Sequence, residues 1–188
     1  MTAQDLFPDR PESAAIGPLA AILYHDTPPD ALLAGFARRL IAQGLRVGGV
    51  VQERPATAAG CRCAEMALLA LASGHRTPVA QPLGPGSTGC RLDFGALAQV
   101  AQDLLGEIDA GLDLLILNRF GKAEAEGRGF RDVIAAALAR EIPVLTALHP
   151  RNLPDWTRFT EGAALLLVPD ETTLHHWLDD SRGVAHAA

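Results

Sequence analysis

The sequence has few cysteines, no excess of positive charge and no long apolar run. Its three cysteines are too few, and odd in number, for a disulfide framework, so reduced thiols are expected. The net charge of −6 disfavours nucleic acid as a partner. No run approaches the roughly 18 apolar residues that a membrane span needs, and residues 1–15 do not have the layout of a signal peptide. We therefore expect a cytoplasmic protein without membrane insertion.

The chain of 188 residues, 48% of them hydrophobic, is long enough for one domain with a substantial core. Residues 1–17 are polar and contain proline, which is typical of a flexible arm. The sequence therefore predicts a single α/β domain over residues 18–180, followed by a flexible tail over residues 181–188. An apolar chain with an acidic exterior is also compatible with a homo-oligomer.

Apolar runs and helical periodicities alternate about five times along the chain. This alternation predicts a three-layer fold, in which helices cover both faces of a parallel sheet. Asp26 or Thr27 is expected to cap the first helix. Strands are predicted at 19–24, 45–53, 76–84, 112–118, 144–149 and 163–169, helices at 31–44, 64–74, 94–110, 129–140, 155–162 and 171–180, and a loop at 84–93.

The loop after the first predicted strand lacks a phosphate cradle. In P-loop enzymes this loop reads G-x-x-x-x-G-K-[ST], and its backbone amides surround the phosphates. Here the stretch is YHDTPPDALL, in which two prolines remove two amides, and Asp26 and Asp30 would repel a phosphate. We therefore expect a core of this class without a standard phosphate-binding loop.

Three stretches carry a family resemblance that extends from Leu19 to Pro169. LRVGGVVQE, LDLLILNRFGKAEAEGRGF and IPVLTALHP resemble the small bacterial and archaeal nucleoside-triphosphatases of the P-loop class. GCRLD and LNRFGKAEAEGRGF are more similar to an uncharacterised bacterial family placed near those enzymes. Members of that family are commonly encoded beside molybdate transport genes. The resemblance implies a P-loop-like fold and a connection with molybdenum metabolism.

The resemblance places Asn118 and Arg119 where the triphosphatases have an Asp-Glu pair. Asparagine cannot act as a general base, and arginine would oppose a magnesium ion, so this departure argues against hydrolysis. Arg119 would instead attract an anion, and with Lys122 and Arg128 it could form a positive pocket. In the alternative interpretation, these side chains pair with the neighbouring acidic residues Glu124, Glu126 and Asp132 on a solvated surface.

The glycine-rich stretch LGPGSTGCRLD is a second candidate for anion binding. Its glycines, Gly89 among them, would let successive amides face one point, while Ser87 and Thr88 add hydroxyl donors and Arg91 adds charge. Asp93 could cap the following helix and hold Arg91 in place. Loops of this composition are also ordinary linkers, so both interpretations stay open.

The cysteines and histidines offer weaker signals. Cys61, Cys63 and Cys90 could ligate a soft metal, but the C-x-C spacing is short for a zinc site, and unreactive thiols are the better interpretation. His25 and His149 are predicted at strand ends, where either could contact an anion. No metal and no cofactor is therefore assigned.

Three functions are compatible with these signals. The first is a non-hydrolysing P-loop-like protein that binds a small oxyanion, molybdate or tungstate being suggested by the family's gene neighbours, or a ligand carrying such a group. The second is a divergent nucleoside-triphosphatase, in which Glu53 and Glu124 would position the metal and water. The third is a regulatory or assembly protein that acts through protein contacts. The missing cradle and acidic pair favour the first and the third.

Overall fold

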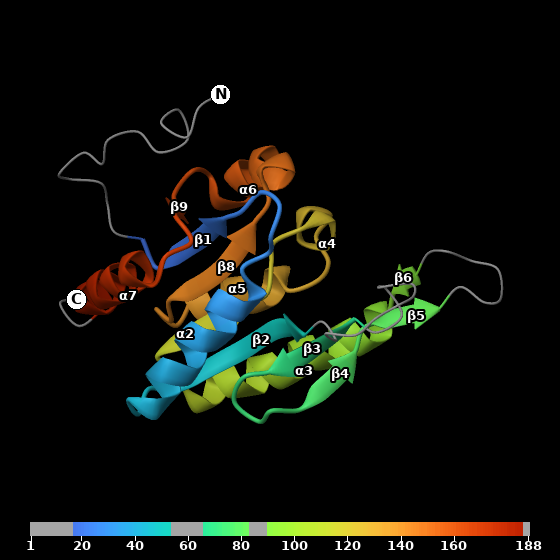
Figure 1. The fold of residues 1–188 in the computed structure, drawn as a ribbon, viewed down its shortest axis with the longest axis horizontal. Helices are drawn as coiled ribbons and strands as arrows, with labels where there is room; N and C mark the ends of the chain where they lie inside the picture. The colour runs from blue at the N-terminus through green and yellow to red at the C-terminus, as the bar shows by residue number, and fades with distance from the viewer. Residues whose placement is uncertain (1–16, 54–65, 83–89, 186–188) are drawn as a thin grey trace.

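The computed structural model describes residues 17–53, 66–82 and 90–185. Over these ranges the chain forms a seven-stranded sheet in the order β4-β3-β2-β7-β8-β1-β9, and a separate two-stranded sheet of β5 and β6 lies beyond one end of it (Figure 1). The strands are β1 (Leu19–Leu23), β2 (Val47–Glu53), β3 (Ala67–Ala70), β4 (Arg76–Pro78), β5 (Ala80–Pro82), β6 (Cys90–Leu92), β7 (Leu114–Leu117), β8 (Val144–Leu148) and β9 (Leu165–Leu167).

Five strands form the parallel part of the sheet, and this confirms the α/β fold expected from the sequence. β1 lies between β8 and β9, and β7 lies between β2 and β8, with every pairing parallel. β7 and β8 are fully buried, as expected for strands that helices cover on both faces. β3 and β4 extend the sheet in antiparallel fashion, so the whole sheet is mixed and not purely parallel.

The helix predicted at 64–74 is wrong, because this segment contains strand β3. Ala and Leu favour a helix by intrinsic propensity, but β2 offers a free edge with which Ala67–Ala70 pairs. Leu68 belongs to the core on one face of the sheet, and Leu69 packs against the core on the other face. As a strand, the segment packs a leucine into the core on each face of the sheet. Tertiary packing therefore overrides the local preference for a helix.

The helices cover both faces of the sheet. Side chains of α2 and α7 form one core cluster with Ile22 and Ile116, whereas side chains of α3, α5 and α6 form the other with Leu115 and Leu117. Pro29 occupies the N-cap of α2 without a side-chain hydrogen bond, so the expected cap by Asp26 or Thr27 is wrong. The helices are α2 (Asp30–Ala42), α3 (Phe94–Ala110), α4 (Lys122–Ala125), α5 (Arg131–Leu138), η1 (Pro150–Asn152), α6 (Leu153–Thr160) and α7 (Glu171–Ala185).

The paired glycines of β2 allow a close approach between strands. Gly49 has φ of +111°, and a Cβ atom there would lie 1.9 Å from the Ile116 carbonyl oxygen of β7. The Gly49 amide donates to the Glu107 carboxylate at 3.1 Å, so α3 supplies the acceptor in the middle of a strand. Burial, together with the charge of Asp103, raises the pKa of Glu107 despite this hydrogen bond.

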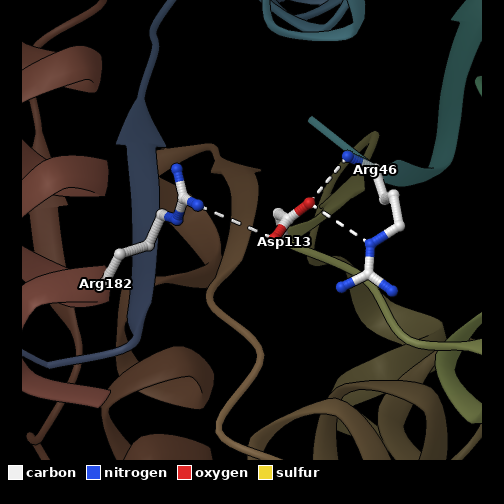
Figure 2. Close-up of polar contacts among 3 residues, drawn as sticks. All are labelled: Arg46, Asp113 and Arg182. Atoms are coloured by element: carbon white, nitrogen blue, oxygen red, sulfur yellow. Dashed lines mark hydrogen bonds and ion pairs between the residues drawn. The ribbon is translucent and has the colours of Figure 1, made fainter. Parts of the chain in front are cut away.

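An ion-pair cluster joins three elements at the amino ends of β2 and β7. The Asp113 carboxylate accepts hydrogen bonds from the backbone N–H of Arg46 at 2.8 Å and from its Nε at 3.4 Å, and Arg182 of α7 lies 3.7 Å away on the other side (Figure 2). Partial burial alone would raise the pKa of Asp113. The Arg46 hydrogen bonds and the two positive charges hold it below its ordinary value of 3.8.

No helix in the described part of the chain combines the length and apolar character needed to cross a membrane.

Candidate functional site

A cavity of about 280 Å³ lies beside the carboxyl ends of β2 and β7. Its polar lining residues at these strand ends are Gln52, Asn118 and Arg119, and Lys122 and Glu124 of α4 also line it. Ligands of doubly wound folds bind at the carboxyl ends of the strands, so the cavity occupies the position expected for a site. The remaining walls are largely apolar and come from Met66, Leu68, Val79, Leu92, Leu97 and Phe130.

Arg119 connects the cavity with the start of α2. Its Nη2 donates to Gln52 Oε1 at 2.6 Å and lies 3.5 Å from Asp30 Oδ2. The Arg119 side chain is only 30% exposed and the Asp30 side chain 13%, so water screens this pair incompletely. The Arg119 Nε is buried, and no described residue accepts a hydrogen bond from it. The guanidinium therefore lies at the site with an unused donor.

Asp30 occupies the N-terminal turn of α2, where P-loop proteins hold phosphate. A helix N-terminus favours negative charge, and here a side chain of the protein supplies that charge. Asp30 also offsets part of the positive charge of Arg119. An anion that approaches Arg119 must therefore compete with Asp30.

Glu124 holds the loop that follows Arg119 in place. Its two carboxylate oxygens accept hydrogen bonds from the backbone amides of Gly121 at 2.9 Å and Phe130 at 3.1 Å. Burial raises the pKa of Glu124, although these hydrogen bonds oppose the shift. Gly129 has φ of +64°, and a Cβ there would lie 2.1 Å from the carboxylate. Glu124 is thus an organising residue, with both oxygens already engaged.

Lys122 and Arg128 lie on the surface in the structure. The Lys122 ammonium is 3.5 Å from Glu126, and its side chain is 86% exposed, although Lys122 is also one of the residues that line the cavity. Arg128 is also paired with Glu126 and lies over the Phe94 ring at 4.6 Å. Of the three predicted basic residues, only Arg119 is held at the polar end of the cavity.

Several predicted site residues fall where the structure does not describe them. Ser87, Thr88 and Gly89 lie outside the described residues, as do Cys61 and Cys63. Cys90 and Arg91 belong to β6, which pairs with β5, but their side chains are likewise outside the description. Asp93 does cap α3, since its carboxylate accepts from the Ala96 amide at 3.0 Å. The proposed anion nest stays a prediction.

The histidines have structural partners or lie at the surface. His149 Nδ1 accepts from the Arg151 amide at 3.2 Å, and its ring packs edge-on against Tyr24. His25 is exposed. Within the described ranges, no group of three or more His, Cys, Asp or Glu side chains is placed to hold a metal ion.

Two residues of the site were not singled out from the sequence. The sequence predicts Gln52 only as part of a strand, and Asp30 only as a residue that repels phosphate. The available signal for Gln52 was its polarity in the otherwise apolar run VGGVVQ. Both line a second cavity of about 540 Å³ between α2 and β3. Gln52 also lines the first cavity, so this acceptor of the Arg119 hydrogen bond is shared by the two cavities.

The chain has a P-loop NTPase-like α/β fold, in which Asn118 and Arg119 follow strand β7. In agreement, the chain is similar in structure to a human cancer-related nucleoside triphosphatase solved in solution. The TM-score is 0.57 at 18% sequence identity, over 90% of this chain and 98% of that chain. At this identity the similarity establishes the fold.

Residues 19–177 match the family described as "Protein of unknown function (DUF2478)", and the chain belongs to that family. The chain is also similar to the Molybdenum import ATP-binding protein ModC 2 of Bradyrhizobium diazoefficiens, with 38% identity over 164 residues. The match covers 87% of this chain and 18% of that protein, so the chain corresponds to a small part of this relative. The resemblances drawn from the sequence to an uncharacterised family and to P-loop triphosphatases are confirmed.

Proposed function

We propose that this protein binds a small oxyanion, or a ligand carrying an oxyanion group, without hydrolysing a nucleotide, and that it serves molybdenum metabolism. The observation that carries the proposal is the placement of Arg119. Its partly buried guanidinium has an Nε from which no described residue accepts a hydrogen bond. The sequence resemblance places Arg119 where the triphosphatases have an Asp-Glu pair. Molybdate and tungstate are the preferred anions because a relative of this chain is named as a molybdenum import protein.

The residues available for hydrolysis weaken the alternative of a divergent nucleoside-triphosphatase. The fold shared with a nucleoside triphosphatase favours this alternative. However, Glu53 is paired with Arg76, and Glu124 accepts from two backbone amides. A carboxylate engaged in this way would have to leave its partners to position a metal or a water, and leaving buried amides unpaired is costly.

Titration calorimetry with the full chain tests the proposal. Molybdate, tungstate, sulfate and phosphate are compared with ATP and GTP in the presence of magnesium. We expect heat with the small oxyanions and none with the nucleotides. Arg119→Gln should weaken oxyanion binding at least tenfold, because a hydrogen bond to a charged group contributes about 1.5–3 kcal/mol.

Arg140→Gln is the matched control, since Arg140 is half-exposed and pairs with Asp109 away from the cavity. It should leave oxyanion binding unchanged. Binding of nucleotides alone, with phosphate release above background, would support the triphosphatase instead. If neither kind of ligand binds and a protein partner is recovered, the assembly role is the better explanation.

A further inference from the structure

The walls of the cavity beside Arg119 do not suit a bare oxyanion. Six apolar side chains line it: those of Met66, Leu68, Val79, Leu92, Leu97 and Phe130. They come from β3, β6 and α3 and from the segments next to β3, β4 and α5, so segments far apart in the sequence build one apolar wall. A strongly hydrated ion gains nothing from such a wall, because the side chains offer no donors.

The size of the cavity leads to the same conclusion. Its volume of about 280 Å³ is several times the ~30 Å³ share of a water molecule. It also lies just under the roughly 300 Å³ at which small-molecule pockets commonly begin. A lone oxyanion at the polar end would leave most of this space to water in contact with apolar side chains. An apolar group attached to the anion would displace that water favourably.

Three polar lining residues lie at the carboxyl ends of β2 and β7, and Lys122 and Glu124 of α4 line the cavity as well, with both Glu124 oxygens engaged by backbone amides. Asn118 and Arg119 follow β7, and Gln52 lies near the end of β2 on the face that Val50 also occupies. Since successive residues of a strand alternate between faces, Gln52 points to the same side as the apolar wall. The cavity therefore has a charged region beside a larger apolar region. Few small molecules carry groups that complement both.

We infer that this site binds an organic anion with a compact apolar or aromatic body more tightly than it binds a free oxyanion. The inference rests on the proposed function, in which Arg119 binds the anionic group. It assigns the apolar side chains to the body of the ligand. Specificity then comes from the combination, because neither a neutral ring nor a free oxyanion fills both ends.

A matched series of probes tests the inference by calorimetry on the full chain. Benzenesulfonate carries both features, methanesulfonate carries the same anionic group without the ring, and benzyl alcohol carries the ring without the charge. We expect benzenesulfonate to bind at least tenfold more tightly than either of the others. Molybdate and sulfate are measured in parallel as free oxyanions, and benzenesulfonate should also bind more tightly than either of them.

Substitutions locate the binding. Ala123→Leu adds bulk to a half-buried helical residue that lines the cavity. It should weaken the binding of benzenesulfonate at least tenfold and change the binding of methanesulfonate little. Ala98→Leu, at an exposed position of α3 away from the cavity, is the matched control and should change neither. Thermal unfolding checks that both variants fold. If Ala123→Leu does not, Leu92→Trp fills the same space from another partly buried position.

Each outcome decides between the claims. Equal affinities for benzenesulfonate and methanesulfonate, both weakened by Arg119→Gln, would overturn this inference and leave the oxyanion site standing. Equal affinities for benzenesulfonate and benzyl alcohol would remove the anionic requirement. Binding that the filling variants leave unchanged would place the ligand outside this cavity. If no anion binds at all, both the inference and the proposed function are wrong.

Discussion

Asp30 is the residue that sets how strongly Arg119 can attract an anion. Their pair is largely buried, and it must be broken or shared when an anion binds. Asp30→Asn removes the competing charge, and we expect the affinity for molybdate to rise about three- to tenfold. The reason is that a partly screened ion pair contributes on the order of 1 kcal/mol. Calorimetry measures the change.

Asp179→Asn alters the net charge equally at an exposed position of α7 and serves as the control. If both substitutions raise the affinity alike, the effect is one of net charge and not of the pair.

The partners of Arg119 could not have been found from the sequence, because Gln52 is 67 positions away from it. Only the fold brings Asp30, Gln52 and Arg119 together.

Glu124 is a residue whose role is structural and whose effect depends on pH. Its pKa in the folded protein is raised above the ordinary 4.5, so the folded state binds its proton more tightly than the unfolded state does. Its contribution to the free energy of unfolding is therefore fully present below pH 4.5 and is lost as pH rises through the folded pKa. Glu124→Gln should remove this dependence and lower the free energy of unfolding at pH 7 by about 1–3 kcal/mol, because one backbone amide loses its acceptor.

Urea denaturation of the wild type and of Glu124→Gln, from pH 4.5 to pH 7, measures both effects. Glu141→Gln, at an exposed position, is the control and should follow the wild type. A difference between the wild type and Glu124→Gln that stays constant across this pH range would contradict the assignment.

At the scale of the element, β2 depends on Gly49. Its positive φ and the 1.9 Å approach of the Ile116 carbonyl leave no room for a side chain. Gly49→Ala should therefore lower the free energy of unfolding by about 3 kcal/mol or more, because both the backbone and the β7 strand must shift. Gly106→Ala in α3 has nothing within 4 Å and should raise it by about 0.5–1 kcal/mol. Urea denaturation of both variants provides the comparison. Equal changes in the free energy of unfolding would show that the close approach of Ile116 does not exclude a side chain at position 49.

Elements with a strong local signal could be predicted, and elements defined by their neighbours could not. The continuous apolar runs gave β7 and β8 correctly, and helical spacing with Asp93 as a cap gave α3 with its observed ends. The paired glycines of β2 lie where the backbone of a neighbouring strand comes close, since Gly49 lies against Ile116. β3 was missed because its strand character comes from pairing with β2 and from two cores, and neither is visible in a local window.

At the scale of the whole molecule, α7 closes the fold by contacts at the amino side of the sheet. Trp177 Nε1 and Ser181 Oγ donate to the Gly17 carbonyl at 3.2 Å and 3.4 Å, just before β1. Arg182 reaches Asp113 at the start of β7 (Figure 2). The C-terminal helix thus holds the starts of β1 and β7, which are both parallel strands of the sheet but are not neighbours in it. These contacts lie at the opposite ends of the strands from the cavity, so stability and binding can be altered separately.

Asp113→Asn tests this separation. The folded carboxylate has a lowered pKa, so its contribution to stability is present above the ordinary value of 3.8 and is lost as pH falls through the folded pKa. The variant should unfold more easily than the wild type at pH 7, by about 1 kcal/mol for partly exposed ion pairs. This difference should shrink as the pH is lowered from 4 toward 2, and anion affinity should stay unchanged.

Urea denaturation against pH, with Asp179→Asn as the control, measures the first effect, and calorimetry measures the second. An equal difference at every pH, or a change in affinity, would mean that the cluster does more than join α7 to the sheet.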